Sequence, residues 1–197
     1  MKKILIFLIF TIFSSILLLD TTIEKRDISY KDFQAFEDSV KLNFYRKALI
    51  SKISFYTKDP EVSELIIYET YVNSKRYKIP FESILALIFA ESDFNIEALG
   101  PVGEKGLTQI TKTTIKFYED TYKVKIVNEY NISQNISIGC WYLSTKLKTA
   151  KNEREAFALY NAGIYWETSG ILYFNRIIEK RRIIEKWLNI YKQQKKE

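Results

Sequence analysis

The chain has 197 residues, 47% of them hydrophobic and 15% aromatic, which is enough to bury the core of one domain. Histidine is absent, which excludes histidine metal sites and every Ser-His or Cys-His nucleophilic mechanism, so acid–base chemistry must use carboxylates, tyrosine or lysine. The formal net charge of +6 is mild and the basic residues are dispersed, so nothing indicates a nucleic-acid partner. The single cysteine, Cys140, lies in an apolar run and is expected to be a buried structural thiol.

The N-terminus has the pattern of an export signal. Two lysines precede a continuous apolar run over residues 4–19, whose length of 16 falls just short of the roughly 17–25 residues of a spanning helix. We expect residues 1–19 to be an uncleaved signal anchor, or a signal peptide cleaved near Ser14–Ser15 or Asp20. Both alternatives export the rest of the chain to the periplasm or cell envelope, the first with an anchor in the inner membrane.

Residues 20–60 are expected to form a polar connector and an accessory helix. Apolar residues recur at intervals of three or four, which predicts a helix over Ser29–Tyr56. This stripe needs a partner surface, and three explanations remain open: a partner protein, a spacer from the membrane, or packing against the following domain. Pro60 suits the first turn of a second helix that continues through Tyr77.

The next predicted helix, from Pro80 to Ser92, carries an acid on its apolar face. Ile84, Leu87, Ile88 and Glu91 occur at i, i+3, i+4 and i+7, which is one side of a helix. Burial disfavours the charged form of a carboxyl group and raises its pKa toward the range that a general acid needs. Glu91 is therefore the strongest candidate for a catalytic group.

The second half of the chain predicts further helices and no sheet, so we expect a mainly α fold with its catalytic domain at 61–189 and a basic tail at 190–197. The densest Gly/Pro cluster, at 100–106, predicts a loop. Ser133 is the expected N-cap of one helix and Gly163 the expected terminator of another. These helices are expected at about Thr111–Tyr122, from Ser133 through Leu147, at Glu153–Ala162 and at about Ile171–Tyr191.

Three separated segments form a recognisable set: Glu91-Ser-Asp-Phe-Asn95, Gly106-Leu-Thr-Gln-Ile110 and Tyr160-Asn-Ala-Gly163. In order and spacing they resemble the motifs of the soluble lytic transglycosylase (SLT) family, and the resemblance covers roughly Val62 to Trp187. It implies a goose-type lysozyme-like helical domain, here preceded by the signal or anchor and the extra helical segment. It also takes in Asn135-Ile136, Gly139 and Tyr142-Leu143.

The resemblance also implies roles for five residues. Glu91 matches the family's catalytic acid/base, and Gln109 matches the glutamine that lines the saccharide cleft. Tyr160 and Asn161 match the pair in the third motif, whose tyrosine lies close to the catalytic glutamate. Ser92 matches the serine after that glutamate, either as a substrate contact or in a structural role.

Some positions depart from the family pattern and bear on how a substrate is positioned. Thr108 stands where the family usually has methionine, which removes a flexible apolar contact to the sugar. Gly100 occupies the place of a frequent serine, Leu159 replaces an alanine and Ile96 replaces a common proline. None of these departures touches the catalytic carboxylate.

The implied reaction needs one carboxylate and neither a metal nor an organic cofactor. Glu91 would protonate the glycosidic oxygen between N-acetylmuramic acid (MurNAc) and N-acetylglucosamine (GlcNAc) of peptidoglycan glycan strands. It would then accept the proton of the muramyl C6 hydroxyl as that oxygen attacks C1, which gives a 1,6-anhydro product. The substrate's own acetamido group would stabilise the positive charge, as in other substrate-assisted glycosidases.

Two other functions remain open. A muramidase of the same fold would need a positioned water and a second acid; Asp93 and Glu97 are near in sequence, but Asp93 lies about 200° around the helix from Glu91. A non-catalytic protein could instead hold peptidoglycan near an envelope machine, whose identity the residues do not indicate. Among the aromatic residues, Tyr165 and Trp166 are the best candidates for stacking on a sugar, because they follow the third motif in an expected loop.

Overall fold

The computed structural model describes residues 30–162 and 166–195, and every regular element in these ranges is an α-helix. The mainly α prediction is therefore confirmed for the described residues. The chain divides into two units, Met1–Ser39 and Val40–Glu197. No helix in the described ranges is long and apolar enough to cross a membrane, and the expected signal at residues 1–19 lies outside these ranges.

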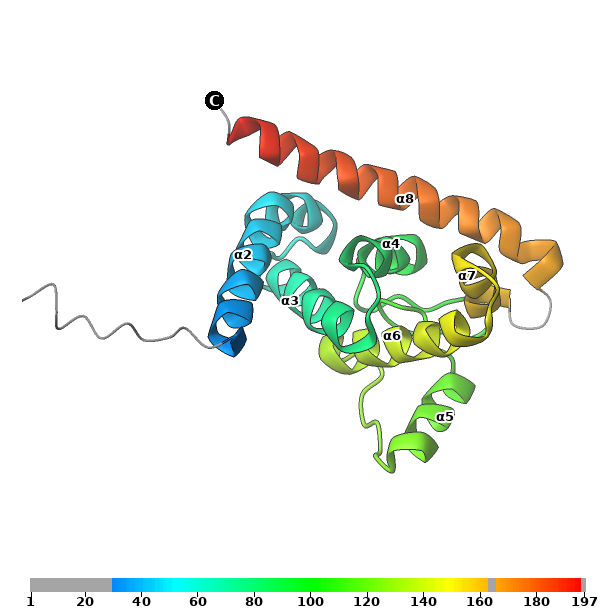
Figure 1. The fold of residues 1–197 in the computed structure, drawn as a ribbon. Coiled ribbons are helices and arrows are strands. Elements are labelled where there is room, and N and C mark those ends of the chain that lie inside the picture. The colour runs from blue at the N-terminus through cyan, green and yellow to red at the C-terminus, as the bar shows by residue number, and fades with distance from the viewer. Residues whose placement is uncertain (1–29, 163–165, 196–197) are drawn as a thin grey trace, which may run out of the picture. The chain divides into compact units, whose positions relative to one another are not determined.

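The helices lie close to the predicted ranges, with two differences at their starts. The N-cap of the fifth is Asn131, whose side chain accepts a hydrogen bond from the Gln134 amide, so Ser133 lies inside the helix. The last helix begins at Trp166, which therefore lies in a helix and not in the loop expected after the third motif. Gly163, the expected terminator, lies outside the described residues. The helices, labelled in Figure 1, are α2 (Tyr30–Thr57), α3 (Pro60–Tyr77), α4 (Phe81–Ser92), α5 (Lys112–Tyr122), α6 (Ile132–Thr149), α7 (Glu153–Ala162) and α8 (Trp166–Gln194).

Local sequence explains where α3 begins and ends. The Asp59 side chain accepts hydrogen bonds from the amides of Glu61 and Val62, at 2.8 and 3.3 Å, and Pro60 occupies the first turn. At the other end Lys78 adopts a left-handed conformation (φ 56°) and its amide donates to the Ser74 carbonyl. The chain then turns into α4 within a few residues.

Helix α4 is the centre of the core. All of its residues from Phe81 to Ala90 are buried except Glu82, so the helix is covered on every side and not on one face alone. It contacts α3 and α8, and Figure 1 shows the long α8 passing beside both α4 and α7. Each large apolar side chain buried in this way stabilises the fold by about 1.5–3 kcal/mol relative to exposure. Glu91 follows this buried stretch, in the last turn of α4.

The part of α2 that begins at Val40 packs on the same core. Tyr45, Leu49 and Ile53 are buried, and the Tyr45 ring stacks on Phe81 with ring centroids 3.9 Å apart. The Tyr45 hydroxyl also donates to Glu82 Oε1 at 3.1 Å. Of the three explanations for the apolar stripe of this helix, packing against the domain accounts for Phe44 and Ala48, whereas Val40 is exposed.

Candidate active site

A cavity of about 420 Å³ collects side chains from α4, α5, α6, α7, α8 and the connection between α4 and α5. Four of the five predicted site residues line it, namely Glu91, Gln109, Tyr160 and Asn161. We call the side formed by Glu91 of α4 and Arg176 of α8 the helical wall. The side formed by Pro101, Glu104 and Gln109 is the loop wall.

Glu91 combines partial burial with a single strong hydrogen bond. The Tyr173 hydroxyl donates to Glu91 Oε1 at 2.5 Å. Burial raises the pKa of the Glu91 carboxyl to about 7, and the nearby charge of Glu104 adds to the increase. The hydrogen bond from Tyr173 and the positive charge of Arg176 act in the opposite direction. Near neutral pH the carboxyl is therefore present in both protonation states. A group that gives a proton and then takes one back needs access to both states.

The tyrosine bound to Glu91 is one that sequence reasoning did not assign. Tyr173 is buried in the core, and with Ile177, Ile184 and Leu188 it forms the buried stripe of α8. The sequence signal that could have identified Tyr173 is its hydroxyl at the start of a buried stripe, because a buried tyrosine needs a hydrogen-bond partner. Tyr160 is also buried and lines the cavity, but its hydroxyl donates to the carbonyl oxygen of Thr108 at 2.8 Å.

The side-chain amide nitrogen of Gln109 is fully bonded within the protein, whereas its carbonyl oxygen is not. Its Nε2 donates to the backbone oxygens of Ala98 and Gly106, at 3.1 and 2.9 Å, which uses both amide hydrogens. No described residue donates to Oε1. Gln109 also has a positive φ of 47°, a conformation that costs a non-glycine residue about 1 kcal/mol or more. Local contacts therefore impose the orientation of this side chain.

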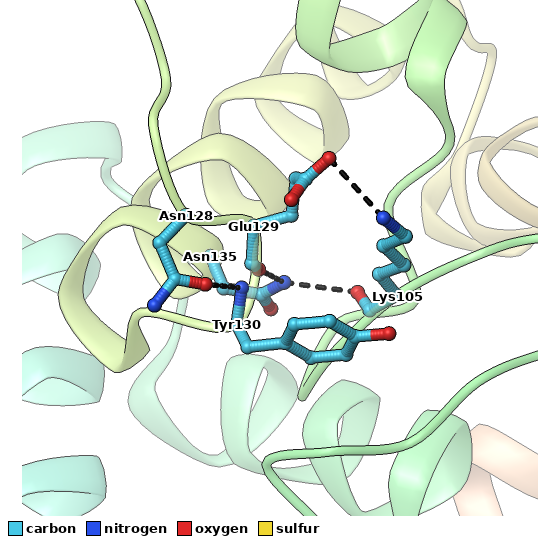
Figure 2. A network of polar contacts seen from close by, with 5 residues as sticks. All are labelled: Lys105, Asn128, Glu129, Tyr130 and Asn135. Atoms are coloured by element: carbon cyan, nitrogen blue, oxygen red, sulfur yellow. Dashed lines mark hydrogen bonds and ion pairs between the residues drawn. The ribbon is translucent and has the colours of Figure 1, made fainter.

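Asn135 of α6 joins the second motif to the segment before α6, and Figure 2 shows the two bonds that its Nδ2 donates. Its Nδ2 donates to the backbone oxygens of Lys105 and Glu129, at 2.9 and 2.8 Å, and its Oδ1 accepts from the amide and hydroxyl of Thr108. The Lys105 ammonium group also pairs with the Glu129 carboxylate at 3.3 Å. A buried amide with every partner in place defines one geometry for the segments it joins. Sequence reasoning noted Asn135 within the resemblance but did not assign it this role.

Thr108 faces the interior of the protein. It is fully buried, and a Cβ added at Gly139 would lie 2.5 Å from its Oγ1, so a side chain at Gly139 would displace it. The difference from the family's usual methionine therefore changes the packing between this segment and α6. Thr108 does not line the cavity.

The structure does not bring Ser92 to the cavity. Its hydroxyl lies 3.0 Å from the carbonyl oxygens of both Ile88 and Leu107, so it ties the end of α4 to the second motif. Asp93 is exposed and pairs with Lys180 at 2.9 Å, and Glu97 is exposed as well. Neither of these acids lines the cavity, whereas Glu104, which sequence reasoning did not consider, does.

Nothing in the described ranges gathers three or more His, Cys, Asp or Glu side chains into a potential metal site. Cys140 is fully buried, and burial raises the pKa of its thiol far above the usual value. It therefore remains a protonated packing residue at physiological pH.

The transglycosylase SLT domain family matches residues 70–168, a range that includes Glu91, Gln109 and Tyr160. Because this match spans half of the chain, the protein belongs to that family. The family resemblance predicted from the three motifs is confirmed.

Three solved structures are also similar to the chain. One is the lytic transglycosylase Slt of Pseudomonas aeruginosa, an inactive mutant, with 22% identity over 64% of this chain and 24% of that one and a TM-score of 0.48. The 70-kDa soluble lytic transglycosylase of Escherichia coli has 20% identity over 84% of this chain and 30% of that one, with a TM-score of 0.46. A complex of the 70-kDa soluble lytic transglycosylase with bulgecin A has 20% identity over 84% and 31%, with a TM-score of 0.47. The chain thus spans less than a third of the length of each of these proteins.

Proposed function

We propose that the protein is a peptidoglycan lytic transglycosylase that cleaves the β-1,4 bond between MurNAc and GlcNAc and leaves a 1,6-anhydro-MurNAc end. The observation that carries the proposal is the state of Glu91: a half-buried carboxyl on the wall of a cavity, with its pKa raised to about 7. Membership of the SLT family supports the substrate class, because the family acts on the cell wall. The site of action would then be the periplasm or cell envelope, with residues 4–19 as signal or anchor.

In the proposed reaction Glu91 acts twice. Its protonated carboxyl gives a proton to the glycosidic oxygen as the C1–O bond breaks, and the GlcNAc-side alcohol leaves. The carboxylate then takes the proton of the muramyl C6 hydroxyl while that oxygen bonds to C1, which restores the acid. The acetamido group of the muramyl residue stabilises the charge at C1 between the two steps. No metal or organic cofactor is required.

The surrounding groups suit this cycle. The Tyr173 hydroxyl holds one carboxyl oxygen, which fixes the orientation of the acid. Gln109, Tyr160 and Asn161 line the same cavity and are proposed to contact the glycan, whereas Ser92 is proposed to act only by tying α4 to the second motif.

The test is product analysis. Purified protein is incubated with peptidoglycan sacculi, and the released muropeptides are identified by mass spectrometry. Anhydro-muropeptides that are absent with Glu91→Gln are the expected result. Binding to sacculi without turnover by the unmodified protein would instead support a non-catalytic role in holding peptidoglycan.

A muramidase reaction is the second candidate, and one observation favours it. Glu104 places a second carboxylate on the same cavity as Glu91, and hydrolysis with a positioned water ordinarily uses two carboxyl groups. Hydrolysis leaves reducing MurNAc ends, so the same mass spectra distinguish the two reactions. Reducing ends that disappear with Glu104→Ala would identify the hydrolase.

A further inference from the structure

Glu104 is a carboxylate on the loop wall that retains unused hydrogen-bonding capacity. Its Oε2 accepts from the Val102 amide at 3.0 Å, which holds the side chain in place. Among the described residues no lysine or arginine forms an ion pair with it, although Arg176 lines the same cavity. A carboxylate has about four acceptor positions, so most of those of Glu104 remain available to a ligand.

Gly100 makes room for this carboxylate beside Gln109. A Cβ added at Gly100 would lie 2.4 Å from Glu104 Oε2 and 2.6 Å from Gln109 Oε1. Both distances are far below van der Waals contact, so any side chain at Gly100 would displace one or both acceptor groups. The family often has serine at this position. Glu104 can keep its observed place in this chain only because residue 100 is glycine.

The two side chains together make the loop wall an acceptor surface. The amide hydrogens of Gln109 already bond to Ala98 and Gly106, which leaves its Oε1 next to the carboxylate of Glu104. Two adjacent acceptors with no donor between them are complementary to hydroxyl and amide N–H groups. Hydrogen bonds to an ionised acceptor are also about twice as strong as neutral ones. A glycan strand carries such donors on every sugar.

We propose that Glu104 is a substrate-binding residue that, together with Gln109 Oε1, accepts hydrogen bonds from hydroxyl or acetamido N–H groups of the glycan strand. The inference rests on the proposed function and adds to it a residue that the three motifs do not contain. Its effect on Glu91 agrees with this position, because the negative charge of Glu104 helps raise the pKa of that carboxyl. The other polar groups that act on Glu91 are Tyr173 and Arg176 of α8, and Tyr160 of α7 interacts with it electrostatically.

The test measures binding without turnover. All variants are made in a Glu91→Gln background, and their affinity for purified peptidoglycan sacculi is measured by co-sedimentation. Glu104→Ala is expected to raise the apparent Kd about tenfold, the size of effect for losing hydrogen bonds to a charged group. Glu104→Gln is expected to raise it only about threefold, because the carboxamide oxygen still accepts. Gly100→Ser should weaken binding as Glu104→Ala does, since it displaces the acceptors.

The matched control is Glu97→Ala, which removes an exposed acid from the same connection without touching the cavity. It should leave the Kd unchanged. An unchanged Kd for Glu104→Ala, or an equal loss for Glu97→Ala, overturns the inference. So does a loss of kcat of more than about a hundredfold in the otherwise unmodified enzyme with unchanged Kd, because Glu104 would then be a catalytic base.

Failure of this inference and failure of the proposed function give different results. Binding that depends on Glu104, with no anhydro product from the unmodified protein, keeps the binding role and refutes the transglycosylase. Anhydro product together with a Kd that Glu104→Ala leaves unchanged keeps the transglycosylase and refutes the binding role of Glu104. A parent protein that does not bind sacculi at all overturns both.

Discussion

The two walls of the cavity are held in place by different forces. The helical wall places Glu91 at the end of α4, a helix buried on every side, and braces it with Tyr173 of α8. The loop wall, with Glu104 and Gln109, lies on a non-helical connection that is anchored by the buried Leu107 and Ile110 and by hydrogen bonds to Asn135 and to neighbouring carbonyls. The proposed acid thus lies on a helix packed on every side, and the proposed binding groups lie on a connection.

This difference predicts two classes of variant. Changes on the helical wall should alter the chemical step and its pH dependence while the core keeps the fold intact. Changes on the loop wall should alter substrate binding and loop geometry, because hydrogen bonds to side chains and carbonyls fix the non-helical backbone of this connection. Variants on each wall, each with a matched control, test this contrast.

Glu91→Gln should lower kcat on peptidoglycan by about a thousandfold or more, because it removes the only group proposed to donate and accept the proton. The rate of anhydro-muropeptide release measures it. Asp93→Asn is the matched control, since Asp93 is adjacent, exposed and paired with Lys180. An equal loss in both variants would show that the site tolerates no local change and that Glu91 has no special role.

Asn135→Ala should destabilise the protein by about 2–4 kcal/mol, because it removes the partners of the Thr108 amide and the Glu129 carbonyl oxygen and a second bond to the Lys105 carbonyl oxygen. Urea unfolding measures the loss, and KM should rise more than kcat falls in the folded protein. Asn128→Ala is the control: Asn128 is exposed and bonds only to the Tyr130 amide in the same network, so a cost under about 1 kcal/mol is expected. Equal costs would contradict the central position of Asn135.

The raised pKa of Glu91 makes stability depend on pH. The folded carboxyl holds its proton up to about pH 7, above its unfolded value, so stability falls as pH rises from about 4.5 to 7. Glu91→Gln removes this loss. Relative to the unmodified protein it should gain about 3 kcal/mol between pH 4 and pH 8, measured by urea unfolding at both values. A constant difference between the two proteins across this range would mean that the acid is not desolvated.

Tyr173→Phe should lower kcat about tenfold, because the acid loses its orienting hydrogen bond. The bond favours the carboxylate, so its loss should raise the pKa of Glu91 further and move the alkaline limb of the pH–rate profile upward. Tyr160→Phe is the comparison on the loop side. It breaks the bond to Thr108 and should raise KM without moving that limb. A limb that moves equally in both variants would remove the distinction between the walls.

Sequence patterns located the elements of the helical wall and left its contacts open. Apolar spacing predicted the helix that carries Glu91, because the residues on the buried face of a helix recur every three or four positions. The partner of Glu91 was not predictable from spacing, because Tyr173 lies on another helix and reads in sequence as one more core aromatic. Trp166 was expected in a loop because it follows the third motif, where Gly163 was the expected terminator of the preceding helix.

The loop wall was even less accessible from sequence. Resemblance alone pointed to Gln109. It left Ser92 open between a substrate contact and a structural role, and the Ser92 hydroxyl bonds to two backbone carbonyls outside the cavity lining. Glu104 has no periodicity or motif that distinguishes it from an exposed acid. Its place on the cavity follows from the turn between Leu99 and Ile110, where Lys105 bridges to both ends.

The helical class, the family and the choice of Glu91 as the proposed acid could be read from the sequence, because they depend on local periodicity and on short motifs. Only the folded structure revealed that Tyr173 bonds to Glu91, that the amide hydrogens of Gln109 are bonded to backbone oxygens, and that Glu104 lines the same cavity. These are contacts between segments distant in the chain, and they arise from packing and hydrogen-bond geometry that no single segment contains.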